Sequence, residues 1–330
     1  MPRTRLDLDR IRASRAVIDQ RFLDTPLTPC DALGRELGCT VSVKLETANP
    51  VRSFKARGTE LVTSNLVDRG ETAVVCASAG NLGQALAWSG GRRGLAVTVV
   101  ASKRAPATKL DRIRALGAEL ILVDGDIETA RDLASRIAHE RGVRLVEDSL
   151  DLETCEGAAT IGLELAAATP AFDTVLIALG GGAMATGIGH VLKTLTPAVE
   201  VVCVQPAGAP ALTLSWRARR VVTTDSTDTI ADGVAGRHPI PEVLTDLLAV
   251  ADDAVLVRES SITTAMRLLL EHAGLVVEPS AALGVAAILE APARFADRHV
   301  VTVVCGANVD PTAFHEWVRP PHPAPEHGGS

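Results

Sequence analysis

The sequence predicts an α/β protein with mostly parallel strands. Short runs of β-branched aliphatic residues alternate with segments that have the amphipathic pattern of helices. Aromatic residues make up 2% of the chain and Tyr is absent, so aliphatic side chains supply most of the 47% hydrophobic content. This balance is typical of parallel sheets covered by helices on both faces. In such sheets, functional residues gather at the carboxyl ends of the strands, next to helix N-termini.

The alternation also predicts how the chain is divided. Its 330 residues favour two domains. Residues 71–146 form a βαβαβ pattern of their own, so we expect a small domain at 71–146 inserted into a larger one made of 1–70 and 147–319, with the active cleft at their junction. The tail 320–330 is rich in Pro, His and Gly and is expected to be disordered. The predicted strands are Thr40–Leu45, Thr72–Cys76, Ala96–Val100, Glu119–Val123, Thr174–Ala178, Val199–Val204 and Val300–Val304, and helices are predicted at Lys109–Leu116, Ile127–Glu140 and Ser261–Glu271.

Composition and charge argue against several classes of protein. The net charge is -7 and the two signs are interspersed, whereas a nucleic-acid surface needs a basic stripe. No uncharged apolar run approaches the roughly 20 residues of a membrane-spanning helix. The N-terminus lacks the apolar stretch of a secretion signal, so a cytoplasmic location is expected. The six cysteines occur singly without a CxxC pair, which indicates neither disulfides nor a zinc site.

Lys55 is the first candidate for chemistry, in the run Ser-Phe-Lys-Ala-Arg-Gly at 53–58. A lysine in such a position is most often an ordinary surface residue. A lysine that forms a Schiff base must be partly desolvated so that its amine is available as a nucleophile. Phe54 is one of five phenylalanines in the chain and can supply that apolar setting.

A glycine-rich loop follows the predicted strand 174–178. A strand, a glycine loop and then a helix offer backbone N–H groups and a positive dipole end to a phosphate. Ile188 and Gly189 stand where a P-loop needs Lys followed by Ser or Thr, and Ala185 stands where a dinucleotide fingerprint needs glycine. A cofactor monophosphate therefore fits better, although a glycine turn without a ligand is the plain alternative. The loop residues are Gly180, Gly181, Gly182, Ala183 and Met184.

Two further loops follow predicted strands. Small residues at 78–84 let a ligand approach the backbone, and the helix that begins there offers N–H donors to a substrate carboxylate. The Asn81 amide can bind an aromatic hydroxyl, while the alternative role of Ser78 or Asn81 is a helix N-cap. Cys305 ends the last predicted strand, where a lone cysteine is more often a core thiol.

The order and spacing of these motifs resemble the threonine/serine dehydratases and serine racemases among the fold-type-II pyridoxal-phosphate enzymes. The resemblance covers residues 11–318 and includes further motifs at 44–46, 156–164, 229–234 and 278–282. It implies a fold like that of the tryptophan synthase β subunit, with two open twisted, mostly parallel sheets and helices on both faces. It also implies pyridoxal 5'-phosphate as cofactor, a small amino-acid substrate and a homodimer.

The resemblance implies a role for each candidate residue. Lys55, beside Phe54, forms the Schiff base and carries the Cα proton, Asn81 contacts the ring hydroxyl, and Cys305 lies beside the pyridine nitrogen. Glu278 lies near the cofactor or caps a helix. The phosphate is held by backbone N–H groups of Gly180, Gly181, Gly182, Ala183 and Met184, with Ala183 in place of the usual fourth glycine; the substrate loop is Ser78, Ala79, Gly80, Asn81 and Leu82.

Two of these residues favour elimination. A thiol at Cys305 is a weak donor and cannot keep the pyridine nitrogen protonated, which disfavours a long-lived carbanion. Racemisation needs a second acid/base opposite the lysine, and Ala79 stands where the racemases carry a serine. We therefore expect a dehydratase that converts L-threonine or L-serine to a 2-oxo acid and ammonia. The alternatives are a racemase or a β-replacement enzyme and, from another class, a non-enzymatic nucleotide-binding α/β protein.

The resemblance also bears on metal binding. Related enzymes bind a divalent ion through two carboxylates, and Gln205 and Ala211 occupy the matching segment here. A hard divalent cation would lack charge compensation without those carboxylates. We expect no metal requirement of the magnesium or calcium kind, while backbone carbonyls can still hold a monovalent ion.

Overall fold

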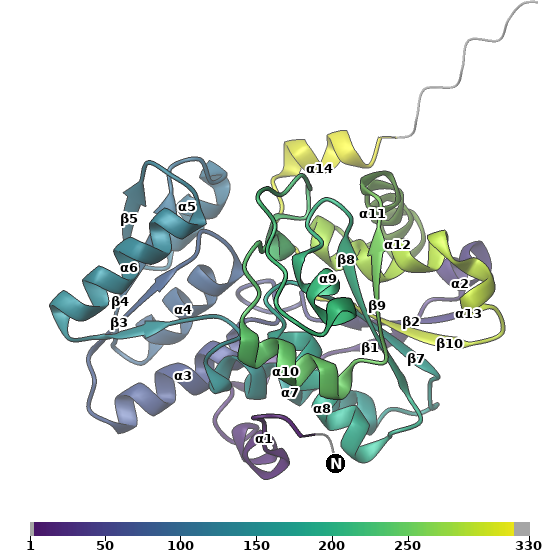
Figure 1. Ribbon diagram of the computed structural model, residues 1–330, viewed down its shortest axis with the longest axis horizontal. Helices are drawn as coiled ribbons and strands as arrows, with labels where there is room; N and C mark the ends of the chain where they lie inside the picture. The colour runs from purple at the N-terminus through teal and green to yellow at the C-terminus, as the bar shows by residue number, and fades with distance from the viewer. Residues whose placement is uncertain (1–2, 320–330) are drawn as a thin grey trace, which may run out of the picture.

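The computed structural model describes residues 3–319 and contains two sheets in two lobes (Figure 1). The larger sheet has six strands in the order β1-β2-β10-β7-β8-β9, all parallel except the antiparallel edge pair of β1 and β2. Its strands are β1 (Leu27–Pro29), β2 (Thr40–Leu45), β7 (Thr174–Ala178), β8 (Glu200–Pro206), β9 (Asp253–Val257) and β10 (His299–Val304).

The smaller sheet has four parallel strands in the order β5-β4-β3-β6. It forms the lobe on the left of Figure 1, coloured blue to teal. Its strands are β3 (Ala73–Ala77), β4 (Ala96–Ser102), β5 (Glu119–Val123) and β6 (Arg144–Val146).

Helices flank both sheets. In the larger lobe α12 packs on β7, β8 and β9, while α8 packs on β7 and α7. In the smaller lobe α4 and α6 pack on β3 and β4. The helices are α1 (Leu8–Ser14), α2 (Asp31–Leu37), α3 (Ala56–Asp68), α4 (Asn81–Arg92), α5 (Ala107–Ala115), α6 (Ile127–Arg141), α7 (Leu152–Ala166), α8 (Ala183–Leu195), α9 (Ala211–Ala218), α10 (Pro241–Val250), α11 (Glu259–Ala273), α12 (Leu283–Glu290), α13 (Pro292–Phe295) and α14 (Pro311–Trp317).

The predicted α/β class with two mostly parallel sheets is confirmed, and each predicted strand is present within two residues at either end. The strands β1, β6 and β9 were not predicted. The strands β1 and β6 have only three residues each. They are strands because of their backbone pairing with β2 and β3, and no distinct apolar run in the sequence marks them. The division at 70/71 and 146/147 stays a prediction; Val62 and Leu66 of α3 pack into the core of the smaller sheet.

Two further expectations concern membrane spans and the C-terminal tail. Within residues 3–319, no helix combines the length and apolar character needed to span a membrane. The predicted disordered tail at 320–330 lies outside the described residues.

The two sheets bring several strand ends to one region. Parallel pairing aligns the carboxyl ends of β2, β10 and β7, and likewise those of β3 and β6. The loops that follow these five strands therefore meet between the lobes. They carry Lys55, Cys305, the glycine loop, the loop at 78–82 and the segment that begins at Glu147.

Candidate active site

Backbone pairing with the end of β10 positions Lys55. The Phe54 N–H donates to the Cys305 carbonyl at 3.1 Å, and the Ala307 N–H donates to the Arg52 carbonyl at 2.9 Å. Asn49 closes the preceding loop by donating from its side chain to the Glu46 carbonyl at 2.8 Å. The chain then turns into α3, so that Lys55 stands at the N-terminus of this helix.

A cavity of about 350 Å³ lies between the two lobes, and every candidate residue from the sequence lines it. Their roles stay predictions, but the structure brings these distant segments together. The lining residues expected from the sequence are Phe54, Lys55, Ser78, Ala79, Gly80, Asn81, Leu82, Gly180, Gly181, Gly182, Ala183, Met184, Glu278 and Cys305.

The Lys55 ammonium has two partners. Its Nζ donates to Asp148 Oδ2 at 2.6 Å and lies 4.6 Å from the centroid of the Phe54 ring. The Lys55 side chain is 16% exposed, and Phe54 is buried. The apolar setting expected from Phe54 is therefore present. Asp148 was not predicted, because it follows the short strand β6, which sequence reasoning missed.

The glycine loop has the features of a phosphate site. Within residues 3–319, no backbone carbonyl accepts from the N–H groups of Gly180, Gly181, Gly182 or Met184. These donors stand at the N-terminus of α8, where the helix dipole favours an anion. The Ala183 N–H instead donates to the Ser149 hydroxyl at 3.1 Å.

Small size is required at this loop. Gly182 has φ of 108°, and a Cβ added there would lie 2.4 Å from Val243 Cγ1. A Cβ at Gly181 would lie 2.6 Å from Ser149 Oγ. The phosphate of the implied cofactor needs free N–H donors and a space that a side chain would fill. The loop offers both, so its residues fit that phosphate.

Asn81 belongs to a hydrogen-bonded group on the cavity wall. Its Nδ2 donates to Glu278 Oε1 at 2.9 Å, and its Oδ1 accepts from Asn308 Nδ2 at 2.7 Å. The alternative of a side-chain N-cap is wrong for Asn81, because α4 begins at Asn81 after Gly80 without a side-chain cap. Ser78 Oγ accepts from the Gly80 N–H at 3.2 Å and closes a local turn.

Glu278 and Cys305 are both buried beside this group. Burial raises the pKa of Glu278, and the charge of Lys109 and the bond from Asn81 oppose that rise. The Glu278 side chain makes no helix-cap bond; its Oε2 accepts from the Asn308 N–H at 3.2 Å. Burial, reinforced by the charge of Glu278, raises the pKa of the Cys305 thiol, which stays neutral.

Ion pairs join the two lobes at the mouth of the cavity. Lys109 of α5 pairs with Asp232, and Arg237 pairs with Asp126, the N-cap of α6, at 2.8 Å. Lys109, Asp232 and Arg237 line the cavity, and sequence reasoning assigned no role to any of the four. For these two ion pairs, the signal in the sequence is opposite charge at positions far apart in the chain.

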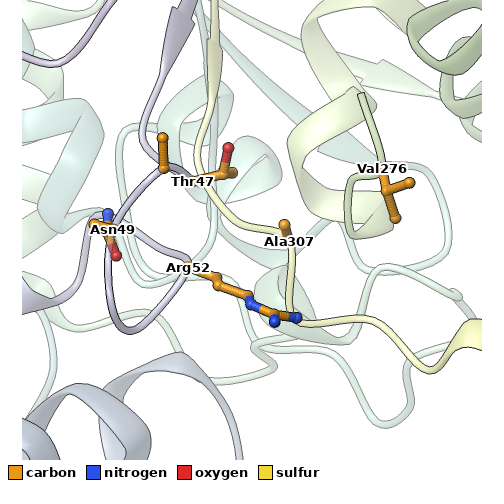
Figure 2. A pocket seen from close by; sticks show the side chains of 6 residues that line it. Thr47, Asn49, Arg52, Val276 and Ala307 are labelled. Atoms are coloured by element: carbon orange, nitrogen blue, oxygen red, sulfur yellow. The ribbon is translucent and has the colours of Figure 1, made fainter. Parts of the chain in front are cut away.

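A second, open hollow of about 560 Å³ lies against the loops that carry Lys55 and Cys305. Figure 2 shows the Arg52 side chain extending along it toward Ala307, with Thr47 and Asn49 on one side and Val276 on the other. Of its six lining residues only Arg52 is charged, so no catalytic group gathers there.

Gln205, in the segment expected to lack a metal site, has a structural role. Gln205 is buried, and its Oε1 accepts from the Thr213 N–H in the first turn of α9 at 2.9 Å. The absence of a divalent-metal requirement stays a prediction.

A lysine in an apolar setting, a helix N-terminus with free N–H groups and an amide held beside them are the features that a pyridoxal-phosphate enzyme site needs. The comparisons with known proteins agree with this class. The family model described as "Pyridoxal-phosphate dependent enzyme" matches residues 18–306, and the chain belongs to that family.

Relatives of two activities are similar to the chain. A serine racemase of Oryza sativa subsp. indica is 31% identical over 317 residues, covering 92% of this chain and 91% of the relative. An L-threonine ammonia-lyase of Thermotoga maritima is 30% identical over 306 residues, covering 92% and 76%. The processed form of threonine deaminase isoform 2 from Solanum lycopersicum has a TM-score of 0.87 at 28% identity, covering 96% and 89%. The predictions of fold type, cofactor and a pyridoxal-phosphate-dependent lyase family are confirmed.

Proposed function

We propose that the protein is a dehydratase that eliminates water from a β-hydroxy amino acid, L-serine or L-threonine, to give a 2-oxo acid and ammonia. The observation that carries this proposal is Ala79. It lines the cavity that contains Lys55, and its methyl group cannot exchange a proton. Threonine ammonia-lyases among the relatives support the same reaction, while serine racemases are equally similar.

Different segments of the chain would bind the cofactor and the substrate. The N–H groups of the glycine loop would hold the cofactor phosphate, and Asn81 Nδ2 would face the ring hydroxyl. The N-terminal end of α4, with the loop from Ser78 to Leu82, would bind the substrate carboxylate. When bound, pyridoxal phosphate withdraws electrons from the substrate and makes the Cα proton acidic.

Lys55 would move that proton. Its Nζ is held by Asp148 in a partly desolvated setting, as a proton-carrying amine requires. Cys305 would offer the pyridine nitrogen only a neutral thiol, which is a weak donor. Weak electron withdrawal favours prompt loss of the β-hydroxyl over return of the proton to Cα.

A racemase or a β-replacement enzyme is the alternative within this class. The homodimer expected from the resemblance and the cytoplasmic location expected from the N-terminal sequence belong to the proposal as well.

The test supplies L-serine or L-threonine to the purified protein with pyridoxal phosphate and measures oxo acid, ammonia and D-isomer. We expect oxo acid and ammonia in equal amounts. D-isomer without oxo acid would overturn the dehydratase assignment. A Lys55→Ala variant that keeps the visible absorption band of the bound cofactor would overturn the role of Lys55.

A further inference from the structure

We propose that Asp148 is a second catalytic residue, which works with Lys55 and donates a proton to the departing β-hydroxyl. This inference rests on the proposed elimination and adds a proton donor on the side of the glycine loop. It begins from the contact between the Lys55 amine and the Asp148 carboxylate, two groups separated by 93 positions in the chain.

The backbone holds Asp148 firmly in place. It follows β6 at the carboxyl edge of the smaller sheet, and the next residue, Ser149, is buried with φ of 67°. The Ser149 N–H donates to Thr154 Oγ1 at 3.0 Å, and Arg5 donates to the Leu150 carbonyl at 3.0 Å. Because hydrogen bonds hold this segment from two sides, the position of the Asp148 carboxylate is fixed.

The two oxygens of Asp148 have different surroundings. Oδ2 accepts from Lys55 Nζ at 2.6 Å. Oδ1 is buried and has no hydrogen-bond partner within residues 3–319. A buried carboxylate oxygen without a partner is costly. The presence of Oδ1 in the cavity therefore indicates that it interacts with a group bound there.

Asp148 lies between the amine and the glycine loop. A Cβ built on Gly181 would be 3.7 Å from Asp148 Oδ2, so this carboxyl would neighbour the cofactor phosphate. The hydrogen bond from Lys55 therefore gives a path for a proton from the amine to a leaving group on this side of the substrate.

Several other ionisable groups near Asp148 and in the cavity are paired or neutral. Burial raises the pKa values of Cys76 and Cys155 to about 12, so both thiols stay neutral. Lys109 is paired with Asp232 and Arg237 with Asp126, and the Glu278 carboxylate accepts from the Asn81 amide. Asp148 is the carboxylate that contacts Lys55 within the described residues.

The proton balance closes without another reactant. Lys55 Nζ, as the neutral amine, takes the proton from Cα and passes a proton to the Asp148 carboxylate across their hydrogen bond. The Cα electron pair forms the Cα–Cβ double bond, the Cβ–O bond breaks with its electron pair on the oxygen, and Asp148 gives the proton to that oxygen, which departs as water. Lys55 is then neutral and Asp148 ionised again, so one proton has moved from Cα to the leaving group.

The test compares two leaving groups in an Asp148→Asn variant. Hydroxide needs a proton to leave, whereas the chloride of β-chloro-L-alanine does not. We expect kcat for L-serine to fall by about 10²-fold or more, in the range of general acid catalysis, and kcat for β-chloro-L-alanine to stay within about threefold. The cofactor dissociation constant, measured by absorbance titration, should change little. Asp148→Glu should restore part of the L-serine activity, and Glu147→Gln, an exposed neighbour, should match the wild type.

Two outcomes would overturn the role of Asp148 alone. One is an Asp148→Asn variant that keeps L-serine turnover within threefold of the wild type. The other is an equal loss with both substrates, which would indicate a structural role. If the wild-type protein releases oxo acid from neither substrate, the proposed function itself is wrong and the role of Asp148 falls with it.

Discussion

Asn308 Nδ2 donates to Asn81 Oδ1 at 2.7 Å, and this bond fixes which end of the Asn81 amide lies beside Glu278. If the Asn81 amide were reversed, its NH2 group would face that of Asn308 and its oxygen would face the Glu278 carboxylate. Asn308 is itself held, because Nδ2 also donates to the Val51 carbonyl at 2.8 Å and Oδ1 accepts from Arg112. The orientation of a predicted cofactor contact is thus set by a residue outside the cavity lining.

Replacing Asn308 with Asp should disturb that orientation. The new oxygen would face Asn81 Oδ1, and turning the amide would only bring that oxygen against the Glu278 carboxylate, so Asn81 would lose its fixed position beside the ring hydroxyl. We expect about tenfold weaker binding of pyridoxal phosphate, the equivalent of one net hydrogen bond, and a shifted visible absorption band. Asn308→Ala, which removes the bond without repulsion, should show a smaller change. An unchanged band and affinity in Asn308→Asp would contradict the positioning role.

Replacing Ala79 with Ser should introduce racemisation. A hydroxyl at this position supplies the second proton-transfer group that racemisation requires. We expect D-serine formation from L-serine to rise by about 10²-fold over the wild type, as measured by chiral chromatography. Ala79→Val is the matched control, since it changes the volume without adding a proton donor. Equal D-serine from the two variants would refute the argument.

Gly182→Ala should weaken both folding and cofactor binding. Its φ of 108° costs an L-residue about 1–3 kcal/mol, and the contact with Val243 Cγ1 adds to that cost. Gly38 is the control: its φ is also positive, at 73°, but no heavy atom lies within 4 Å of an added Cβ. Urea unfolding and cofactor titration should show a larger loss for Gly182→Ala than for Gly38→Ala. Val243→Ala in the same chain should recover part of the difference.

Glu164→Gln should lower stability near neutral pH and reduce its loss in acid. Burial opposes ionisation, but the bonds from Arg57, at 2.6 Å, and from Lys44 hold the pKa of Glu164 below its ordinary value of 4.5. A lowered carboxyl pKa contributes stability above the unfolded-state pKa, and that contribution disappears as pH falls through the folded-state pKa. We expect a loss of about 3–5 kcal/mol near pH 7, as for breaking a buried ion pair.

Urea unfolding across the acid range measures both effects of Glu164→Gln. The wild type should lose stability progressively below about pH 4.5, and the variant should show a flatter profile. Glu36 is exposed, and Glu36→Gln should leave the wild-type profile unchanged. Identical slopes in wild type and Glu164→Gln would exclude this contribution.

Chelation should leave turnover unchanged. Gln205 is a neutral amide already bonded to the Thr213 N–H, so this segment lacks the charge that a divalent ion needs. Activity after dialysis against EDTA, with and without added magnesium or calcium, tests the expectation. Reactivation by either ion would disprove it.

The candidate site was predictable where its signal is local. The sequence shows directly where a predicted strand is followed by glycines or by small residues and an amide. All of those residues line one cavity. Asp148 was missed because its importance comes from Lys55, which only tertiary folding brings to it. The pairing of Lys109 with Asp232 spans 123 positions and was hidden for the same reason. The Asn81 cap alternative failed because the side chain has a better partner, Glu278, across the cleft.

The central place of β10 in the larger sheet has a consequence for biosynthesis. Among residues 3–319 it is the last strand in chain order, yet it lies between β2 and β7. A growing chain can pair the contiguous strands of the smaller sheet early, while the larger sheet remains in two pieces with open edges. Such edges invite association with other chains. Chains that stall before His299 lack the strand that joins β2 to β7, so they should keep these edges exposed until translation passes it.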